Sequence, residues 1–242
     1  MANSALAVLE SALREKKLDR TLITALPPME QPADACAQTG ITAVDACLRN
    51  GVPRGQLSEL TGLRSAGCTT LLLQTMATAT QRGELVALVD TFDRLDVASM
   101  DAAGADLGRV LWVRGQAGGP PEWAIDRALK ALNLVLQAGG FGLVAIDLAD
   151  VPGAMLRRIP FTTWLRVQRA VEGRDTACVL VASEPIARSA GGLTLTLTGR
   201  TSWTGSSARP RVAGAELKMR VVSPRRRVDG EVAIRSYVAA GV

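Results

Sequence analysis

The segment around residues 61–69 constrains the possible folds of this chain more than any other feature. A short apolar run at residues 56–60 leads into a loop framed by Gly62 and Gly67, which is followed by Cys68, Thr69 and a second apolar run. Glycines five positions apart, with hydroxyl residues behind them, follow the strand, loop and helix order of a phosphate-binding loop. This order predicts a strand at 56–60, a loop at 61–67 and a helix at 68–81.

One position departs from the phosphate-binding pattern. The pattern requires a lysine directly after the second glycine, and this chain has Cys68 there. The loop keeps backbone N–H groups for phosphates and the Thr69 hydroxyl for magnesium, but it lacks the charge that neutralises the terminal oxygens. Arg64, inside the loop, could turn toward a phosphate. We therefore expect no ATP hydrolysis and no resident cofactor, with weak binding of ATP and magnesium left open.

Short apolar segments alternate with helical segments along the middle of the chain. Strands are predicted at residues 56–60, 85–90, 109–114, 143–147 and 176–182, and helices at 43–49 (with Thr42 as the cap), 68–81, 94–103, 122–138 and 162–172. Near-continuous apolar strands separated by helices are typical of a parallel sheet covered on both faces.

From residue 193 the pattern changes to period two. It alternates at 193–198, 216–222 and 231–238, with turn-rich residues 199–214 and 223–230 between. Period two indicates antiparallel strands with one solvated face. The predicted fold class is α/β, a mostly parallel sheet flanked by helices and extended by antiparallel C-terminal strands.

Two acidic residues end predicted strands. Asp147 ends the strand at 143–147, the usual position of an aspartate that orders magnesium through water. Asp90 ends the strand at 85–90, and a general base would be most useful two residues later. Phe92 occupies that position, and a phenyl ring cannot orient water. We expect no catalytic residue and a degenerate nucleotide-binding loop made of Gly62, Arg64, Gly67, Cys68, Thr69 and Asp147.

Composition excludes several classes of site. The 242 residues contain no histidine, and the four cysteines are scattered without a C-x-x-C pair. Acid-base chemistry on imidazole is therefore excluded, and we expect no metal site and no disulfide framework. No apolar run reaches the roughly 18–20 residues that cross a bilayer. Because residues 1–20 mix acidic with basic side chains, unlike a signal peptide, we expect a cytoplasmic protein without membrane contact.

The net charge of +5 is concentrated near the end of the chain. From residue 200 onward nine Lys and Arg accompany three Asp and Glu, whereas the remainder is close to neutral. A basic segment favours nucleic acid or an acidic protein surface, although it can also serve only to keep the protein soluble. The main candidate contacts are Arg225, Arg226 and Arg227, supported by Arg200, Arg209, Arg211, Lys218 and Arg220.

The chain divides into two predicted parts. Residues 1–40 form an N-terminal helix and linker, because Leu6, Leu9 and Leu13 recur at helical spacing and prolines follow without periodicity. This helix can dock on its own core or on another molecule. Residues 41–242 form the core domain with the basic C-terminal segment.

Three segments carry a resemblance to a known family. Residues 51–55 lead into the loop, the strand ending in Asp90 follows, and residues 103–113 come next. In this order the chain resembles the RecA recombinase core over roughly residues 41–237. Within that superfamily it most resembles the ImuA family, RecA-like proteins of bacterial mutasomes that are sometimes labelled SulA-like.

The resemblance implies roles for individual positions. The RecA lysine corresponds to Cys68, its magnesium-binding threonine to Thr69 and its catalytic glutamate to Phe92. Its magnesium-ordering aspartate corresponds to Asp147, and its nucleotide-sensing glutamine falls near Glu184. The segments that match the two DNA-binding loops, 149–160 and 186–192, are short. They keep three candidate DNA or partner contacts, Arg157, Arg158 and Arg188.

These losses put ATP-driven filament formation and strand exchange in doubt. The ImuA resemblance implies a non-catalytic adaptor, a pseudo-ATPase of translesion DNA synthesis and mutagenesis in the SOS response to DNA damage. Its implied partners are an ImuB-type polymerase-like protein and an error-prone polymerase, with DNA, RecA and self-association left open. Two alternatives remain: a weak nucleotide-dependent DNA-binding ATPase or recombinase-like protein, in which Arg64 replaces the lysine, and a SulA-type cell-division inhibitor.

Overall fold

The computed structural model describes residues 35–116, 118, 120–187, 192–205, 211–223 and 231–237. Residues 33–242 belong to one compact unit. The helix expected near the N-terminus lies outside the described residues. Among the described helices, none combines the length and the apolar composition that a bilayer crossing requires.

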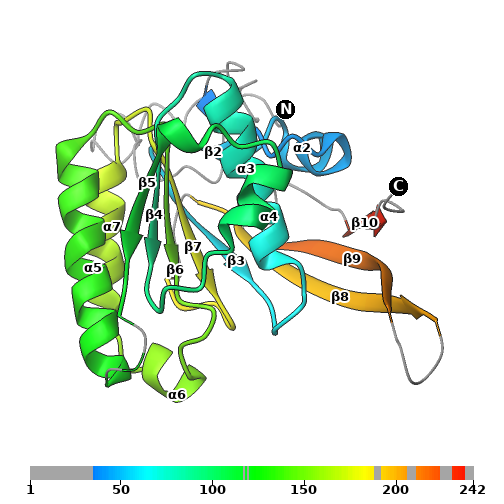
Figure 1. The fold of residues 1–242 in the computed structure, drawn as a ribbon. Coiled ribbons are helices and arrows are strands. Elements are labelled where there is room, and N and C mark those ends of the chain that lie inside the picture. Colours follow the sequence, from blue (N-terminus) through cyan, green and yellow to red (C-terminus); the bar gives the residue numbers. More distant parts are fainter. Residues whose placement is uncertain are drawn as a thin grey trace, which may run out of the picture. The chain divides into compact units, whose positions relative to one another are not determined.

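Eight strands form the central sheet, in the order β10-β9-β8-β3-β7-β6-β4-β5 (Figure 1). Their bounds are β3 (Leu57–Thr61), β4 (Val86–Asp90), β5 (Val110–Arg114), β6 (Leu143–Asp147), β7 (Ala177–Ala182), β8 (Thr194–Thr204), β9 (Arg211–Ser223) and β10 (Glu231–Tyr237). Strands β3 to β8 pair in parallel, and β8, β9 and β10 pair antiparallel. The predicted α/β fold class, with antiparallel C-terminal strands, is confirmed.

Helices cover both faces of the parallel part of the sheet. Figure 1 shows α3 (Cys68–Gln81) and α4 (Val97–Ala102) on one face, and α5 (Pro121–Ala138) and α7 (Phe161–Val171) on the other. Successive side chains of β4 enter different cores, because strand residues alternate between faces. Val86 and Leu88 pack on the α3 side, whereas Ala87 and Val89 pack on the α5 side. Two buried layers explain the near-continuous apolar strands.

Five short elements complete the described fold, one of them the 3-10 helix η2 (Leu107–Arg109). Helix α2 (Thr42–Leu48) precedes β3, and α6 (Gly153–Leu156) follows β6. Strand β1 (Cys36–Ala37) pairs antiparallel with β2 (Val52–Pro53), and all four of these residues are buried. Strand β1 belongs to the compact unit 33–242 and precedes residue 41, where the sequence places the start of the core.

Thr42 was expected to cap the first helix of the core, and this expectation is wrong. Thr42 is itself the first helical residue, and Ile41 before it supplies no side-chain cap. Asp45, in the first turn, instead binds the chain that precedes the helix: its Oδ1 accepts from the Thr39 N–H at 2.8 Å and its Oδ2 from the Gly40 N–H at 3.1 Å. The carboxylate thereby satisfies donors of the chain that enters the helix.

Residues 199–214 were expected to be turn-rich, and most of them are strand. Strand β8 continues to Thr204 and β9 begins at Arg211. Thr201 pairs with Ala215 and Ser202 with Gly214. Small and polar side chains do not prevent a strand here, because these residues are held by the backbone hydrogen bonds between β8 and β9.

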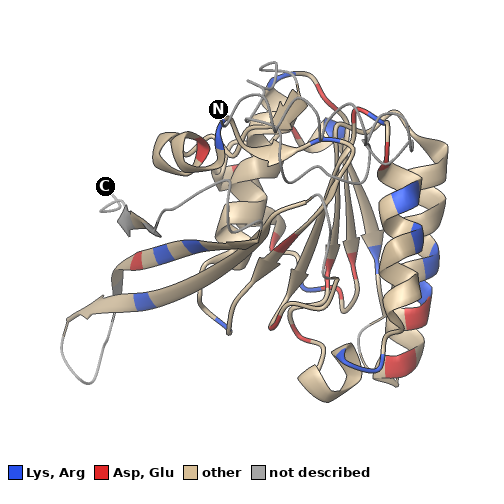
Figure 2. Cartoon of the chain, turned by 180° about the vertical axis from the view of Figure 1, so that it is seen from behind, with Lys and Arg blue, Asp and Glu red and all other residues tan. Residues whose placement is uncertain are grey.

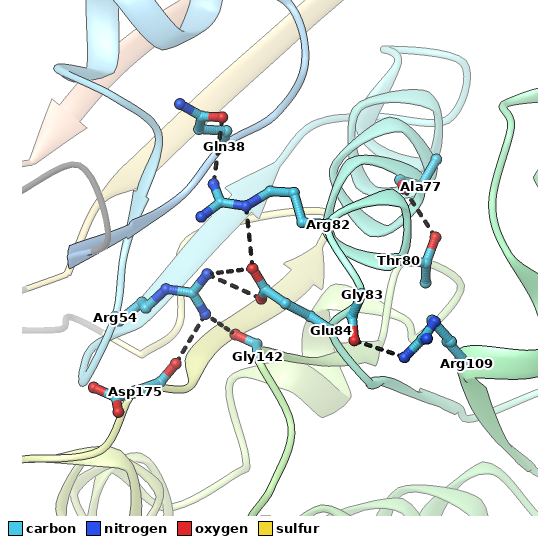
Figure 3. A network of polar contacts seen from close by, with 10 residues as sticks. All are labelled: Gln38, Arg54, Ala77, Thr80, Arg82, Gly83, Glu84, Arg109, Gly142 and Asp175. Atoms are coloured by element: carbon cyan, nitrogen blue, oxygen red, sulfur yellow. Dashed lines mark hydrogen bonds and ion pairs between the residues drawn. The ribbon is translucent and has the colours of Figure 1, made fainter.

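At the end of the sheet opposite the phosphate loop, where the strands begin, Arg54 links the segments that precede four strands (Figure 3). Its Nη2 donates to both Glu84 carboxylate oxygens, at 2.8 and 2.9 Å. Its Nη1 donates to the carbonyls of Gly142 at 2.8 Å and Asp175 at 2.9 Å. Only 10% of the Arg54 side chain is exposed. These contacts hold the starts of β3, β4, β6 and β7 together.

Candidate functional site

The loop between β3 and α3 has the backbone turn that its glycines predict. Gly67 precedes Cys68, the first residue of α3, with a φ of 94°, in the left-handed region that favours glycine. A methyl group at Gly67 would lie 2.6 Å from Leu217 Cδ1 of β9. Glycine is therefore required twice, by the backbone conformation and by the close approach of Leu217. The loop is held directly against the antiparallel strands.

Cys68 occupies the lysine position with an inward-facing thiol. The residue is 7% exposed, and its Sγ would lie 3.0 Å from a methyl group at Gly62. Burial, and then the nearby negative charge of Asp147, raise the pKa of the Cys68 thiol to about 11. At neutral pH the thiol therefore carries its proton, and it supplies neither a cation nor a reactive thiolate.

Asp147 and Asp90 lie opposite each other at the ends of β6 and β4. Oδ1 of Asp147 accepts a 2.8 Å hydrogen bond from the Ala149 N–H. Burial raises the pKa of Asp147 to about 6; the bond from Ala149 opposes this rise, and the charges of Asp90 and Asp150 add to it. Asp147 is therefore partly protonated near pH 6.

Asp90 serves the architecture of the loop that follows it. The residue is 2% exposed, and Oδ1 accepts from the Arg94 N–H at 2.9 Å. Oδ2 accepts from the Leu95 N–H at 2.8 Å and from the Trp112 Nε1–H at 3.1 Å. With three donors in place, this carboxylate orders residues 91–95.

A hollow of about 110 Å³ opens between the start of α3 and the ends of β4 and β6. It brings Thr69 and Asp147, expected to share a magnesium site, to one place with Phe92. Phe92 is half-buried and packs against the core on the α5 side. Phe92 contributes a phenyl ring, and not a carboxylate, to this wall of the hollow. Its lining is completed by Leu72, Leu73, Leu88, Asp90, Arg94, Leu95, Ala149 and Asp150.

Arg64 pairs with Asp150, an acid outside the loop. Its Nη2 and Nε donate to Asp150 Oδ1 at 2.7 and 3.1 Å. Arg94 Nε lies 3.3 Å from Asp150 Oδ2. The Arg64 side chain is 80% exposed, so the pair is a weak, water-screened contact. In this arrangement Asp150 balances the charge that was expected to be available for a phosphate.

An ion pair joins the segment at 149–160 to Glu184, the position expected to match the nucleotide-sensing glutamine. Arg157, at the end of α6, lies with Nη1 2.5 Å from Oε1 of Glu184, which follows β7. Arg158 beside it is exposed. The remaining candidate contacts Arg188, Arg209, Arg225, Arg226 and Arg227 lie outside the described residues, and of Arg211 only the backbone, which begins β9, is described.

Glu59 is a structural residue that the sequence analysis missed. It lies in the middle of β3 with no exposed surface. Its Oε1 accepts from the Ile186 N–H at 2.7 Å and from the Ala187 N–H at 2.6 Å, and its Oε2 from the Thr194 hydroxyl at 3.1 Å. The sequence feature that could have revealed this role is an acidic residue inside a strand that is buried on both faces. A buried carboxylate requires hydrogen-bond donors from within the protein. Glu59 therefore anchors residues 186–187 beside the site.

Within the residues described, no group of three or more His, Cys, Asp and Glu side chains is arranged to hold a metal ion. Thr69 and Asp147 therefore stand without further protein ligands of these types. An ion at this site would depend on water or a bound phosphate for most of its coordination.

The amino-acid sequence is similar to those of known RecA proteins. The chain is 31% identical to Protein RecA of Thermus thermophilus over 159 residues, covering 64% of this chain and 45% of that protein. It is 33% identical to Protein RecA of Rubrobacter xylanophilus over 114 residues, covering 47% of this chain and 31% of that protein. The chain thus spans less than half the length of these relatives. These relatives are RecA proteins, so the similarity supports a RecA-like chain, and the ImuA assignment stays a prediction.

The RecA N-terminal domain model matches residues 7–156. This range includes the phosphate loop, β4 with Asp90, and β6 with Asp147. It covers more than half of the chain, and the described part has the predicted sheet. The protein therefore belongs to the RecA N-terminal domain family.

Proposed function

We propose that this protein is a non-catalytic, RecA-like adaptor of a translesion DNA synthesis complex in the SOS response to DNA damage. Its partners are an ImuB-type polymerase-like protein and an error-prone polymerase. The observation that carries the proposal is the neutral Cys68 thiol, which lies buried against Gly62 where a phosphate loop needs a cation. A preserved scaffold without the catalytic charge fits a protein that acts through its surface.

Two further observations argue against hydrolysis. Arg64, the other cation of the loop, contacts Asp150, and Phe92 occupies the position that the RecA resemblance assigns to the catalytic glutamate. A charge-assisted contact to phosphate contributes roughly 1.5–3 kcal/mol to binding, and more in the transition state. Losing both the lysine and the base removes the two groups on which phosphoryl transfer depends most.

The outer helices offer a surface for a protein partner. Helices α5 and α7 lie side by side on one face of the sheet (Figure 1). On α5, Trp123 is 72% and Leu134 66% exposed, and on α7, Phe161 is 46% and Leu165 42% exposed. Exposed aromatic and aliphatic side chains on neighbouring helices favour a protein interface, where such residues act as anchors.

Co-purification with an ImuB-type protein tests the adaptor role. We expect a stable complex without added nucleotide, an unchanged complex for Cys68→Lys, and weaker binding for Trp123→Ala with Leu134→Ala. Exposed Glu122→Ala on the same helix is the matched control. Failure of the wild-type protein to associate with a folded ImuB-type partner would remove the basis of the proposal.

Calorimetry with ATP and magnesium tests the absence of catalysis separately. We expect no resolvable binding heat for the wild-type protein and measurable binding for Cys68→Lys, because the mutation restores the cation to an otherwise preserved loop. Steady ATP turnover by the wild-type protein would contradict the pseudo-ATPase assignment.

One observation favours a second candidate, a weak nucleotide-dependent DNA-binding protein. Thr69 and Asp147 still share one hollow beside a loop that keeps its left-handed Gly67. This reading requires the affinity for single-stranded DNA to rise when ATP and magnesium are added. An affinity that stays constant through the titration eliminates it.

A further inference from the structure

Helix α7 keeps two large apolar side chains outside its buried stripe. Trp164, Val167 and Val171 form the inward stripe, and each is at most 1% exposed. Phe161 and Leu165 lie one turn apart on another part of the helix, and both are exposed. These two side chains therefore remain available to another molecule.

Helix α5, which lies beside α7, has an outward stripe of similar composition (Figure 1). Its exposed residues at intervals of four, three and four positions are Trp123, Arg127, Lys130 and Leu134. Residues at these intervals share one face of a helix. At roughly 1.5 Å per residue, about 16 Å along the axis separate Trp123 from Leu134. A partner helix of about three turns spans this distance.

The cations of α7 have no counter-ion. Arg166 and Arg169 are exposed, and neither side chain makes a hydrogen bond or an ion pair with the part of the chain that the structure describes. The sequence of α7, from Phe161 to Val171, contains no Asp or Glu. The outward side of α7 is therefore both apolar and positively charged.

The cations of α5 are only partly balanced. Lys130 pairs with Asp126 at 2.7 Å, whereas Arg127 donates to the neutral side-chain amide of Gln116 at 2.9 Å. Figure 2 shows Lys and Arg along these outer helices. Together with the two arginines of α7, Arg127 leaves three guanidinium groups on this face without an acidic partner among the described residues.

We propose that the face formed by these exposed side chains of α5 and α7 binds an amphipathic helix of a partner protein, with acidic residues beside its apolar stripe. Two neighbouring helices with projecting apolar side chains provide rows against which a third helix packs. The guanidinium groups select carboxylates at the borders of that contact. The inference rests on the proposed adaptor role and gives the chemistry of the partner segment.

The charge of this face argues against two other occupants. A second copy docked through the same face would bring the arginines together, because a symmetric dimer pairs a surface with itself. Residues 1–20 of the chain contain four Lys and Arg and three Asp and Glu, so they offer no excess of negative charge. An acidic helix of another protein complements both the apolar side chains and the arginines.

Fluorescence anisotropy with two labelled, designed peptides tests the proposal. Both peptides have about 18 residues, with leucines at helical spacing on one face. The acidic peptide has Glu at the positions beside the leucines, and the neutral peptide has Gln there. Circular dichroism verifies that the two peptides have the same helix content.

Two variants of the protein separate the contribution of charge from that of the apolar side chains. The charge variant combines Arg166→Gln with Arg169→Gln, and the anchor variant combines Phe161→Ala with Leu165→Ala. Thermal melting verifies that both fold, and Leu165→Ala alone replaces the anchor variant if that variant is destabilised.

The matched control combines Arg200→Gln with Arg220→Gln, which removes two exposed cations from β8 and β9. We expect the wild-type protein to bind the acidic peptide at least tenfold more tightly than the neutral one. The charge variant should bind the acidic peptide about fivefold more weakly and the anchor variant at least tenfold more weakly, whereas the control stays within about twofold. Added salt should weaken the wild-type complex more than the charge-variant complex.

Equal affinity for the two peptides, or an equal loss in the control variant, would overturn the proposal. Sedimentation of the wild-type protein with phosphatidylserine vesicles, abolished in the charge variant, would also overturn it, because the face would then bind a lipid surface.

Co-purification of the same variants with the ImuB-type protein separates this inference from the adaptor role. A wild-type complex that survives both variants would overturn the inference and leave the adaptor role intact. Absence of a wild-type complex, together with selective binding of the acidic peptide, would remove the adaptor role and still support the site for an acidic helix.

Discussion

Arg64 of the phosphate loop and Asp150 beyond β6 form an ion pair, with Arg64 Nη2 2.7 Å from Asp150 Oδ1. Arg94 lies on the second oxygen of the same carboxylate, with its Nε 3.3 Å away. Two cations are thus balanced by one acid that lines the hollow. This relationship gives the wild-type site less positive charge than its arginines alone suggest.

Replacing this acid should make the loop a better anion site. In Asp150→Asn, Arg64 and Arg94 lose their counter-ion, so we expect the affinity for inorganic tripolyphosphate to rise by up to about tenfold, since charge-assisted contacts contribute roughly 1.5–3 kcal/mol before the loss of side-chain freedom. Calorimetry measures the change. The double variant Asp150→Asn with Arg64→Gln should lose most of the gain; an unchanged affinity in Asp150→Asn would show that Arg64 does not reach the site.

Asp147 should make stability depend on pH. Its folded pKa of about 6 lies above the ordinary value of 3.8, so the folded protein holds the proton more tightly than the unfolded chain. Stability from this group is fully present below about pH 4 and falls as the pH rises to about 6. We expect Asp147→Asn to exceed the wild type in free energy of unfolding by about 1–3 kcal/mol at pH 8, and to match it at pH 4.

Urea unfolding across this pH range measures the effect. Asp101→Asn, at an exposed position on α4, is the control and should follow the wild-type curve. A constant difference between Asp147→Asn and the wild type at every pH would contradict the titration of Asp147.

The Arg54 network should be worth more than a surface ion pair. Arg54→Lys cannot reach the two Glu84 oxygens and the carbonyls of Gly142 and Asp175 together, so we expect a loss of about 2–4 kcal/mol in free energy of unfolding. Arg109→Lys is the matched control, because Arg109 also bonds an acid, Asp106, and a carbonyl, Gly83. The Arg109 side chain is 43% exposed, so its loss should stay below about 1 kcal/mol. Equal losses would show that burial does not strengthen the network.

Glu59 should control the order of the segment after β7. Glu59→Ala leaves the N–H groups of Ile186 and Ala187 without an acceptor, and we expect a loss of about 2–4 kcal/mol with faster amide exchange at both residues. Glu59→Gln keeps one acceptor oxygen and should give a smaller loss. Hydrogen exchange resolved by residue checks this result. Protection at 186–187 that survives Glu59→Ala would assign their order to other contacts.

Local pattern predicted much of the architecture. Helix α3 and strand β6 have the predicted bounds, because a glycine-framed loop and a run of five apolar and acidic residues leave little freedom in where these elements begin. The strands at 199–204 and 211–214 escaped prediction, because their small and polar residues are ordered by pairing with each other. A pairing of this kind does not appear in the periodicity of either segment.

The sequence by itself determined that the loop has Cys68 in place of a lysine and that residue 92 is a phenylalanine, since side-chain identity does not depend on the fold. Only the tertiary structure decided what the remaining charges do. Asp150 lies 86 positions from Arg64 and reaches it because β6 lies within the same sheet as β3. Glu59 similarly meets Ala187 across 128 positions. Contacts between distant positions follow from strand order, which local patterns of hydrophobicity do not specify.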